Sequence, residues 1–393
     1  MGAASRAAGG AARAGRAAGA VMRIGVVTTS FPRGPDDWAG GFVAGHVSWL
    51  RSQGIDVDVV AAGDGPGRVA PGAALFYGEG APDRLARDRR AWRWAALWSA
   101  ALAAEVRRRA RSWDAAVAHW LVPCGAVAAA LVRRPLVAVA HSGDVHLLAR
   151  TRLAAPVAAL LARAGARVVF AAPAVRARFE AAAGRAARGL DAGVTPMGID
   201  ARRFAALPRR PRRGDTVLFV GRLVPVKGVD VLVDAFARVR ADARLVIAGD
   251  GPEAARLRAA AGPRVEFAGE VRGAARDRLL AAADVVVVPS VEVEGGRSEG
   301  TPVVALEAMA AGVPVVATRA GGLADLPGDV VDRVPPSCPI ALAAAIERGL
   351  AGDPARVARA RRFALAHDWS AVGPRLVPPA IAARLAGPPG GPR

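Results

Sequence analysis

Short apolar runs alternate with longer stretches of helical periodicity along most of the chain. The run IGVVT at residues 24–28 carries no charged side chain, which is typical of a strand buried on both faces. A loop rich in Pro, Gly and Asp follows, then a helical stretch over residues 42–53 and a second apolar run, VDVVA, over 57–61. This order predicts a βαβ unit, and therefore a parallel sheet with a right-handed crossover.

The alternation continues through the first half and begins again after residue 215. Further strands of the first half are expected over residues 115–118, 136–140 and 167–170, with a helix over 91–109. In the second half the pattern predicts strands over residues 216–220, 244–248, 265–268, 284–288 and 313–317. It also predicts helices over residues 229–240, 253–261, 273–282 and 302–311, and two closing helices to about residue 367. Each half is therefore expected to form a doubly wound α/β domain, with ligands bound where the strands end.

The expected boundaries are residues 22–205 for the first domain, 206–213 for a stiff, charged linker and 214–368 for the second domain, with 369–393 following it. Residues 1–21 are a low-complexity segment of Ala, Gly and Arg, without the apolar region of a secretory signal. We expect this tail to be disordered, or to lie upstream of a true start at Met22.

The formal net charge of +20 bears on the choice of partners. Nucleic-acid binding would need arginines clustered on one face, whereas here they are spread over the whole length. Solvated charge is the favoured interpretation and docking to an anionic membrane the second, so nucleic acid is not an expected partner. We expect a monomer or weak dimer.

Cysteine content and hydropathy indicate a cytoplasmic protein. Cys124 and Cys338 lie far apart without metal-ligand spacing, and no apolar run approaches the ~20 residues that span a bilayer. Association with the inner face of a membrane stays open, because the predicted 91–109 helix carries an apolar stripe. Core packing is the more frequent role of such a stripe. Its members are Trp92, Leu97, Trp98 and Leu102.

Lys227 is the only lysine of the chain. It lies in the loop GRLVPVKGVD, five residues after Arg222 and just beyond the predicted strand at 216–220. Neither a Gly-x-Gly-x-x-Gly fingerprint nor a Walker lysine is present, which argues against NAD chemistry and ATP hydrolysis by those routes. Lysine supplies three donors and arginine a bidentate fork, so the pair could converge on one diphosphate. Two solvated surface cations are the alternative interpretation.

The stretch that follows the predicted strand at 284–288 is the most informative. Thr301 and Pro302 have the residue types of an N-cap and a first helical turn, and the free amides of a helix start attract anions. Glu299 precedes this helix and Glu307 lies within it. One carboxylate could accept hydrogen bonds from sugar hydroxyls and the other from ribose hydroxyls. No Asp-x-Asp accompanies them, so a metal is not expected.

In this order the motifs resemble a family 4 glycosyltransferase of the GT-B fold, in which two doubly wound Rossmann-like domains face each other across a cleft. The resemblance covers residues 22 to about 370. The motifs are Gly40-Gly41, His141 to Asp144, residues 195–200 with Phe204, Arg222 with Lys227, residues 248–252, and the pair Glu299 and Glu307. The family implies that the first domain binds the acceptor and the second the nucleotide sugar. It also implies that a C-terminal helix crosses back to the first domain near Trp369.

By this resemblance the second domain holds the donor. Arg222 and Lys227 would grip the nucleotide diphosphate and stabilise the charge that builds on it as the glycosidic bond breaks. Glu299 would bind hydroxyls of the donor sugar, and Glu307 the ribose. Pro302, which has no N–H, would leave the helix start with one donor fewer. Backbone amides would add to the anion site from Gly300, Thr301 and Val303.

In the first domain, the resemblance implies that Gly41 approaches the phosphate closely because it has no side chain. His141 would contact the transferred sugar near the reacting carbon. On the residues alone, His141 and Asp144 would instead cap the helix that begins after Gly143. The family retains anomeric configuration, and no second carboxylate is evident as a nucleophile. Front-face departure and attack are therefore implied, with the acceptor proton passing to the leaving phosphate.

The expected co-substrate is a UDP- or GDP-sugar, without a further cofactor or a metal. A hydroxyl of a lipid-linked or cell-envelope glycan is the favoured acceptor. A nucleotide-sugar epimerase or a phosphorylase on the same fold stays open, although a phosphorylase would need a cofactor lysine that this chain cannot spare. A non-catalytic basic protein that binds nucleic acid or membrane is the alternative from a different class.

Overall fold

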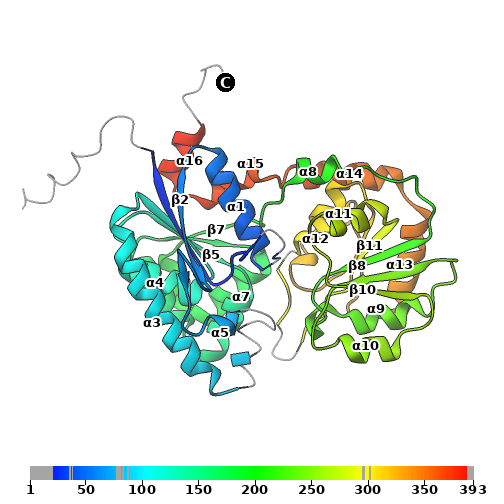
Figure 1. Cartoon of the computed structure of the whole chain (residues 1–393), viewed down its shortest axis with the longest axis horizontal. Coiled ribbons are helices and arrows are strands. Elements are labelled where there is room, and N and C mark those ends of the chain that lie inside the picture. Colours follow the sequence, from blue (N-terminus) through cyan, green and yellow to red (C-terminus); the bar gives the residue numbers. More distant parts are fainter. Residues whose placement is uncertain are drawn as a thin grey trace, which may run out of the picture.

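The computed structural model describes residues 21–34, 37, 39–76, 81, 84–85, 88–293, 297–300 and 302–386. These residues form two lobes, each built on a parallel sheet with helices on both faces (Figure 1). Residues 1–20 of the predicted tail and Thr301 lie outside the described residues. The prediction of two doubly wound α/β domains is confirmed.

The first lobe contains a seven-stranded sheet in the order β3-β2-β1-β4-β5-β6-β7, with every neighbouring pair parallel. Alternate residues of each strand face opposite layers, so both faces need apolar side chains. Ala116 and Ala138 pack toward α3–α7, whereas Val117 and Val139 pack toward α1 and the C-terminal helices. The strands are β1 (Arg23–Thr28), β2 (Asp56–Ala62), β3 (Arg68–Val69), β4 (Ala115–His119), β5 (Leu136–Ala140), β6 (Arg167–Phe170) and β7 (Asp191–Val194).

The helices of this lobe connect its parallel strands. They are α1 (Gly41–Ser52), α3 (Ala91–Arg109), α4 (Ala126–Leu131), α5 (Gly143–Thr151), α6 (Ala154–Arg163) and α7 (Pro173–Ala183). Helix α8 (Ala201–Ala205) follows β7 but packs on the second lobe, where Ala201 and Phe204 join the core. The apolar stripe expected in α3 divides in two. Trp98 and Leu102 are fully buried, whereas Trp92 and Leu97 are exposed. The tryptophan at 98 is therefore a core residue, and its indole N–H donates to Val69 O at 3.1 Å.

The second lobe contains a six-stranded parallel sheet in the order β10-β9-β8-β11-β12-β13. Its strands are β8 (Thr216–Val220), β9 (Arg244–Ala248), β10 (Val265–Gly269), β11 (Val285–Val288), β12 (Val315–Thr318) and β13 (Asp332–Val334). Its helices are α9 (Val229–Phe236), α10 (Ala254–Ala260), α11 (Gly273–Ala282), α12 (Val303–Ala310), α13 (Pro339–Ala351) and α14 (Pro354–Leu365). Helix α9 is shorter than predicted, because the chain turns after Phe236 and brings Val239 into the same core.

The charged linker between the lobes is bound to the C-terminal ends of two helices of the second lobe. Arg209 donates to the carbonyls of Leu280, Ala281 and Ala283 at the end of α11. Arg212 donates to Gly349 O and Leu350 O near the end of α13. The last carbonyls of a helix lack partners within the helix, so guanidinium groups satisfy them and fix the linker to the second lobe.

After α14 the chain returns to the first lobe through α15 (Trp369–Val372) and α16 (Pro379–Ala386), as Figure 1 shows. Trp369 is buried, and its backbone N–H donates to Ile199 O at 3.0 Å. A Cβ on Gly45 or Gly198 would lie 2.4 or 2.6 Å from the indole, so glycine at both positions makes room for it. The predicted crossing of the C-terminal segment is confirmed.

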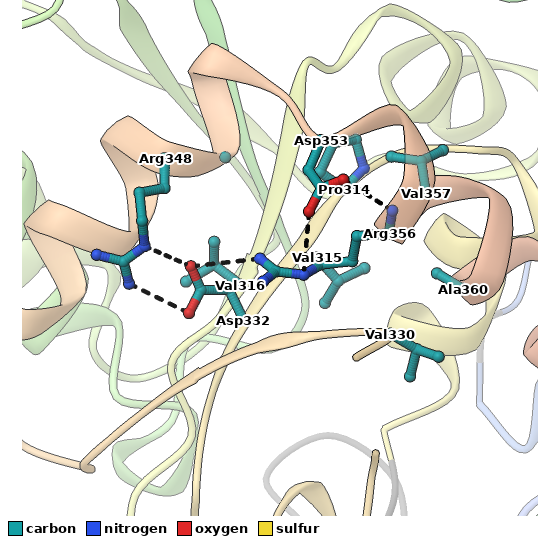
Figure 2. Close-up of a pocket in the computed structure, with 11 residues that line it drawn as sticks. Pro314, Val315, Val316, Val330, Asp332, Arg348, Asp353, Arg356, Val357 and Ala360 are labelled. Carbon is teal, nitrogen blue, oxygen red and sulfur yellow. Dashed lines mark hydrogen bonds and ion pairs between the residues drawn. The ribbon is translucent and has the colours of Figure 1, made fainter. Parts of the chain in front are cut away.

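A small cavity lies between α13, α14 and the strands β12 and β13 (Figure 2). Its volume is about 20 Å³, which holds little more than a water molecule. Asp332 pairs there with Arg348 at 2.8 Å and Arg356 at 3.7 Å, as Figure 2 shows. Asp353 accepts from the Arg356 amide at 2.9 Å and so caps α14. The arrangement joins two helices to the sheet and offers no room for a substrate.

Candidate functional site

Lys227 lies at the end of a short 3₁₀ turn, Pro225–Lys227, in the loop between β8 and α9. Its ammonium is 2.5 Å from Glu299 Oε1, and both side chains are less than one-fifth exposed. The next residue, Gly228, has φ 60° and sits against Pro289 O, where a Cβ would approach to 2.1 Å. This glycine lets the Lys227 loop lie directly against the loop after β11.

Glu299 is held from two sides in that second loop. Ser290 donates its hydroxyl to Glu299 Oε2 at 2.6 Å, while Lys227 occupies the other carboxylate oxygen. The main chain is fixed as well, because Gly322 N donates to Glu299 O at 3.1 Å. Two loops that follow the neighbouring strands β8 and β11 thus meet through one carboxylate. The structure brings together the predicted phosphate-binding lysine and the predicted sugar-binding glutamate.

The helix after Glu299 begins at Val303, one residue later than expected. Pro302 is extended, with ψ 124°, and occupies the cap position instead of the first turn. A cap residue gives no amide to the helix ladder, so the missing N–H of Pro302 does not deplete the first turn. The first bond of that turn is Ala305 N to Pro302 O at 3.1 Å. The amides of Val303 and Val304 precede it and are available to an anion.

Glu307, the second predicted carboxylate, projects from the second turn of α12. It pairs with Arg276 of α11. The guanidinium of Arg276 also lies 5.7 Å from the ring centroid of Phe204. Glu307, which was predicted to bind the ribose, is thus held in an ion pair with Arg276. The sequence pattern did not single out this arginine.

Arg222 lies two residues after the end of β8 and is half-buried. Its loop packs on the turn that contains Gly249 and Gly251, and Leu223 N donates to Asp250 O at 2.9 Å. A Cβ on Gly249 would lie 1.8 Å from Gly221 O, so the two loops touch through main chain alone. Arg222 shares the loop of Lys227, and its role at the diphosphate stays a prediction.

In the first lobe, His141 directly follows β5, and α1 begins beside it. The ring of Phe42 lies 4.9 Å from that of His141. Gly40 has φ 73°, a conformation that favours glycine, and turns the chain into α1. A Cβ on Gly41 would meet nothing within 4 Å, so open space adjoins the start of α1. Gly41 and His141 therefore lie in one neighbourhood, and their contacts with the phosphate and the sugar stay predictions.

Asp144 fixes the loops that follow β4 and β5. It is buried and accepts backbone hydrogen bonds from Leu121 N at 2.7 Å, His141 N at 3.0 Å and Ser142 N at 3.1 Å. The alternative in which His141 and Asp144 cap α5 is not borne out, because no side chain among the described residues caps the start of this helix and Asp144 instead holds the backbone that precedes it. Burial raises the pKa of Asp144, and the backbone donors oppose that rise.

The two lobes touch at the candidate site. Ser142 donates its hydroxyl to Ser298 O at 2.7 Å, and a Cβ on Gly300 would lie 3.2 Å from His141 O. His141 of the first lobe is thereby placed beside the residues that precede α12. The ends of β5, β8 and β11, the start of α1 and the start of α12 converge on one region.

Two further residues of this region, His46 and His119, were not predicted from the sequence. His119 Nδ1 lies 3.1 Å from His141 Nε2, and His46 Nδ1 lies 3.2 Å from His119 Nε2. The contact between His119 and His141 could have been predicted from their positions in the sequence. His119 ends β4, and His141 follows β5, the adjacent parallel strand. The place of His46 depends on the rotation of α1, which the sequence does not fix to one residue.

No group of three or more His, Cys, Asp or Glu side chains suited to a metal ion occurs among the described residues. Within the same part of the chain, no single helix is long and apolar enough to cross a membrane. Helices α5 and α6 reach that length and hydropathy only as a pair, and the pair is bent by 115°.

Comparison with known proteins identifies the class to which this fold and site belong. The model of Glycosyltransferase Family 4 matches residues 41–203, and that of Glycosyl transferases group 1 matches residues 214–351. HepE of Anabaena, solved in complex with UDP and glucose, superposes with a TM-score of 0.65 at 22% identity, over 93% of this chain and 100% of that one. The fold is therefore that of the GT-B glycosyltransferases.

Two relatives show which family the chain belongs to. A D-inositol 3-phosphate glycosyltransferase of Acidothermus cellulolyticus is 34% identical over an alignment of 326 residues that covers 72% of this chain and 70% of that protein. A phosphatidyl-myo-inositol mannosyltransferase of Mycobacterium leprae is 37% identical over 206 residues, covering 49% of this chain and 54% of the relative. The chain thus matches about half the length of the second relative. It belongs to the family 4 glycosyltransferases, as its motifs predicted.

Proposed function

We propose that this chain transfers a sugar from a UDP- or GDP-linked donor to a hydroxyl acceptor, with retention of anomeric configuration and without a metal. One observation carries the proposal: Lys227 pairs with Glu299, which lies three residues before Pro302, the cap residue of α12. A diphosphate there would accept from the ammonium and the helix amides, while Glu299 accepts from sugar hydroxyls. Positive groups fixed at the leaving phosphate stabilise the charge that develops as the glycosidic bond breaks.

Retention is proposed because Glu299, the carboxylate nearest the predicted sugar, is already held by Lys227 and Ser290. A carboxylate that is fixed in this way is suited to binding hydroxyls and poorly placed to act as a nucleophile. The acceptor oxygen would then attack the face from which the diphosphate leaves and pass its proton to the departing phosphate.

For the acceptor we propose a lipid-linked or cell-envelope glycan, with the protein resting on the inner face of an anionic membrane. The names of the two relatives mention phosphatidyl-myo-inositol and inositol 3-phosphate, both of which are polar acceptors with hydroxyl groups. Trp92, Trp94 and Leu97 of α3 are exposed, and Arg90 and Arg93 beside them are exposed as well. Aromatic and cationic side chains together favour an anionic lipid surface.

A thermal-shift panel of UDP, GDP, ADP and their common sugar conjugates tests the donor site. One nucleoside diphosphate should raise Tm by several degrees, because ~100-fold excess over Kd stabilises a protein by about 2.7 kcal/mol. Lys227→Ala should abolish the rise, whereas Arg244→Ala, which removes an exposed cation paired with Glu266, should leave it unchanged.

The chemistry is tested by incubating the donor with candidate acceptors and analysing the products by NMR. Retained configuration and turnover in EDTA support the proposal, and inversion or a strict metal requirement would refute those parts of it. Interconversion of the nucleotide sugar without transfer would indicate an epimerase, and phosphate-dependent cleavage a phosphorylase. Salt-sensitive binding to nucleic acid, with no response to any nucleotide sugar, would indicate a non-catalytic basic protein.

A further inference from the structure

Three imidazoles form a continuous hydrogen-bonded chain from the interior of the first lobe to the candidate site. His46 of α1 and His119 at the end of β4 are fully buried, and His141 after β5 is half-buried. The donor–acceptor distances are 3.2 Å from His46 Nδ1 to His119 Nε2 and 3.1 Å from His119 Nδ1 to His141 Nε2. His141 contacts His119 through Nε2, so Nδ1 of His141 is the nitrogen that remains for a ligand.

The inner end of the chain is closed. The His46 ring stacks between Trp49 and Trp369, with centroid distances of 6.0 and 5.4 Å and interplanar angles of 16° and 12°. His46 Nε2 is buried, and no hydrogen-bond partner for it exists among the described residues. A proton that entered from the cleft would have no group to receive it beyond His46. The three rings therefore cannot conduct protons away from the reaction and need a different role.

The backbone beside the chain is held in costly conformations. Trp120, which follows His119, has φ 69°, and Ser142, which follows His141, has φ 124°. Residues other than glycine adopt such angles at a cost of roughly 1–3 kcal/mol, and only where the surroundings enforce them. Asp144 enforces both, since it binds Leu121 N on one loop and Ser142 N on the other. The positions of His119 and His141 are thus strongly determined.

The chain also determines which nitrogen of each ring carries the proton. Burial lowers the pKa of His46 and of His141 to about 3, and burial, followed by the charges of the neighbouring histidines, lowers that of His119 well below its usual value. All three rings are therefore neutral near pH 7. A neutral imidazole has one N–H and one lone pair, so both hydrogen bonds must run in the same direction.

The two possible directions of these hydrogen bonds have different consequences at His46, the inner end of the histidine chain. If the N–H groups point inward, His46 Nε2 carries a buried proton that has no acceptor. If they point outward, His46 Nε2 carries only a lone pair, and each ring is protonated on Nδ1. A buried donor without an acceptor is the rarer and costlier of the two defects. The outward direction is therefore favoured.

We propose that His46 and His119 are positioning residues that hold His141 as the Nδ1–H tautomer, so that it donates a hydrogen bond into the cleft. The ligand would be an oxygen of the donor sugar or its phosphate, a point that rests on the proposed function. His141 would then stabilise negative charge or orient a hydroxyl oxygen, and would not remove a proton from the acceptor.

Selective ¹⁵N labelling of the imidazole rings tests the tautomers directly, because the whole protein has only five histidines. Protonated and unprotonated ring nitrogens resonate in separate regions of the ¹⁵N spectrum. We expect Nδ1 to be protonated in His46, His119 and His141 near pH 7. Protonation of His141 on Nε2 overturns the inference. This measurement needs no sugar transfer, so it can fail while the proposed function stands, or succeed where that function fails.

Two substitutions of His46 that have nearly equal size separate positioning from packing. His46→Asn keeps an N–H donor where Nδ1 was, whereas His46→Asp places an acceptor there, so that His119 must donate through Nε2 and accept from His141 through Nδ1. We expect the Asp variant to shift His141 toward the Nε2–H tautomer and to lower kcat by about tenfold, the value of one hydrogen bond of ~1.4 kcal/mol. The Asn variant should keep both properties of the wild type. Equal tautomers and equal kcat in all three proteins would refute the positioning role, and the wild-type spectrum decides the tautomer if a variant fails to fold.

Discussion

Lys227 Nζ lies 2.5 Å from Glu299 Oε1, across the two loops that follow β8 and β11. The resemblance assigns these residues to opposite parts of one donor molecule, the diphosphate and the sugar. Each therefore keeps the other in place, and a donor would exchange this single ion pair for two separate sets of contacts. The carboxylate competes with phosphate for the ammonium. Removal of the carboxylate charge should therefore change the affinity for the nucleoside diphosphate in a predictable direction.

Glu299→Gln should strengthen binding of the nucleoside diphosphate and weaken turnover of the nucleotide sugar. Removal of the carboxylate charge frees Lys227 for phosphate, an effect of about 1 kcal/mol, or roughly fivefold in Kd, for a part-buried pair. The same change removes an acceptor for sugar hydroxyls and should lower kcat/KM. Isothermal titration and steady-state kinetics check the two effects. Glu292→Gln, which removes an exposed charge nearby, is the control, and identical behaviour of both variants would contradict the prediction.

The buried histidines predict that the protein loses stability as pH falls below about 6.5. Unfolded histidine binds a proton with a pKa near 6.5, whereas burial lowers the pKa of His46 and His141 to about 3 in the folded protein. The unfolded state therefore gains protons first, and each such group costs up to about 1.4 kcal/mol per pH unit between 6.5 and 3. Urea unfolding at pH 7.5, 6.5 and 5.5 measures the slope. It should be shallower in His46→Phe, and an unchanged midpoint across this range would contradict the prediction.

The sequence predicted the parts of the fold that depend on local pattern. Buried parallel strands such as Val285–Val288 are uninterrupted apolar runs, so both sheets could be recognised from them. The sequence placed Lys227 and Glu299 in loops after predicted strands, whereas the pairing of those strands, β8 and β11, is seen only in the structure.

What the sequence could not predict depends on the phase of a helix or on one torsion angle. Trp92 and Trp98 of α3 look alike in an apolar stripe, but only Trp98 reaches the sheet edge, where Val69 O accepts its N–H. His46 joins His119 because α1 is rotated so that this side chain faces the end of β4. Pro302 is a cap and not a first-turn residue because its ψ is 124°, a value that its residue type does not dictate.

Ser142 offers a test of backbone strain at the contact between the lobes. Its φ of 124° favours glycine, and its hydroxyl donates to Ser298 O. Ser142→Ala and Ser142→Gly both remove this hydrogen bond, but only glycine relieves the strain. The Gly variant should therefore be more stable than the Ala variant by about 1–2 kcal/mol, as measured by urea unfolding. Equal stabilities would show that the φ angle carries no cost.

The exposed face at the start of α3 predicts binding to anionic membranes. Trp94 is 55% exposed and Leu97 47% exposed, and the exposed Arg93 immediately precedes Trp94. Partial burial of both side chains in a bilayer would contribute about 2–3 kcal/mol, and each nearby arginine about 1 kcal/mol. Trp94→Ser with Leu97→Ser should therefore reduce cosedimentation with phosphatidylglycerol vesicles at least tenfold, and high salt should weaken wild-type binding.

The matched control for this surface is Ile340→Ser, which removes a side chain that is 73% exposed on α13 of the second lobe. It takes away a smaller exposed apolar surface on the other lobe and should leave vesicle binding unchanged. If the control lowers binding as much as the α3 variant does, the attraction is general hydrophobicity and not a defined face. If neither variant matters but salt still does, the distributed arginines alone hold the protein to the lipid, because their charge acts without insertion of apolar side chains.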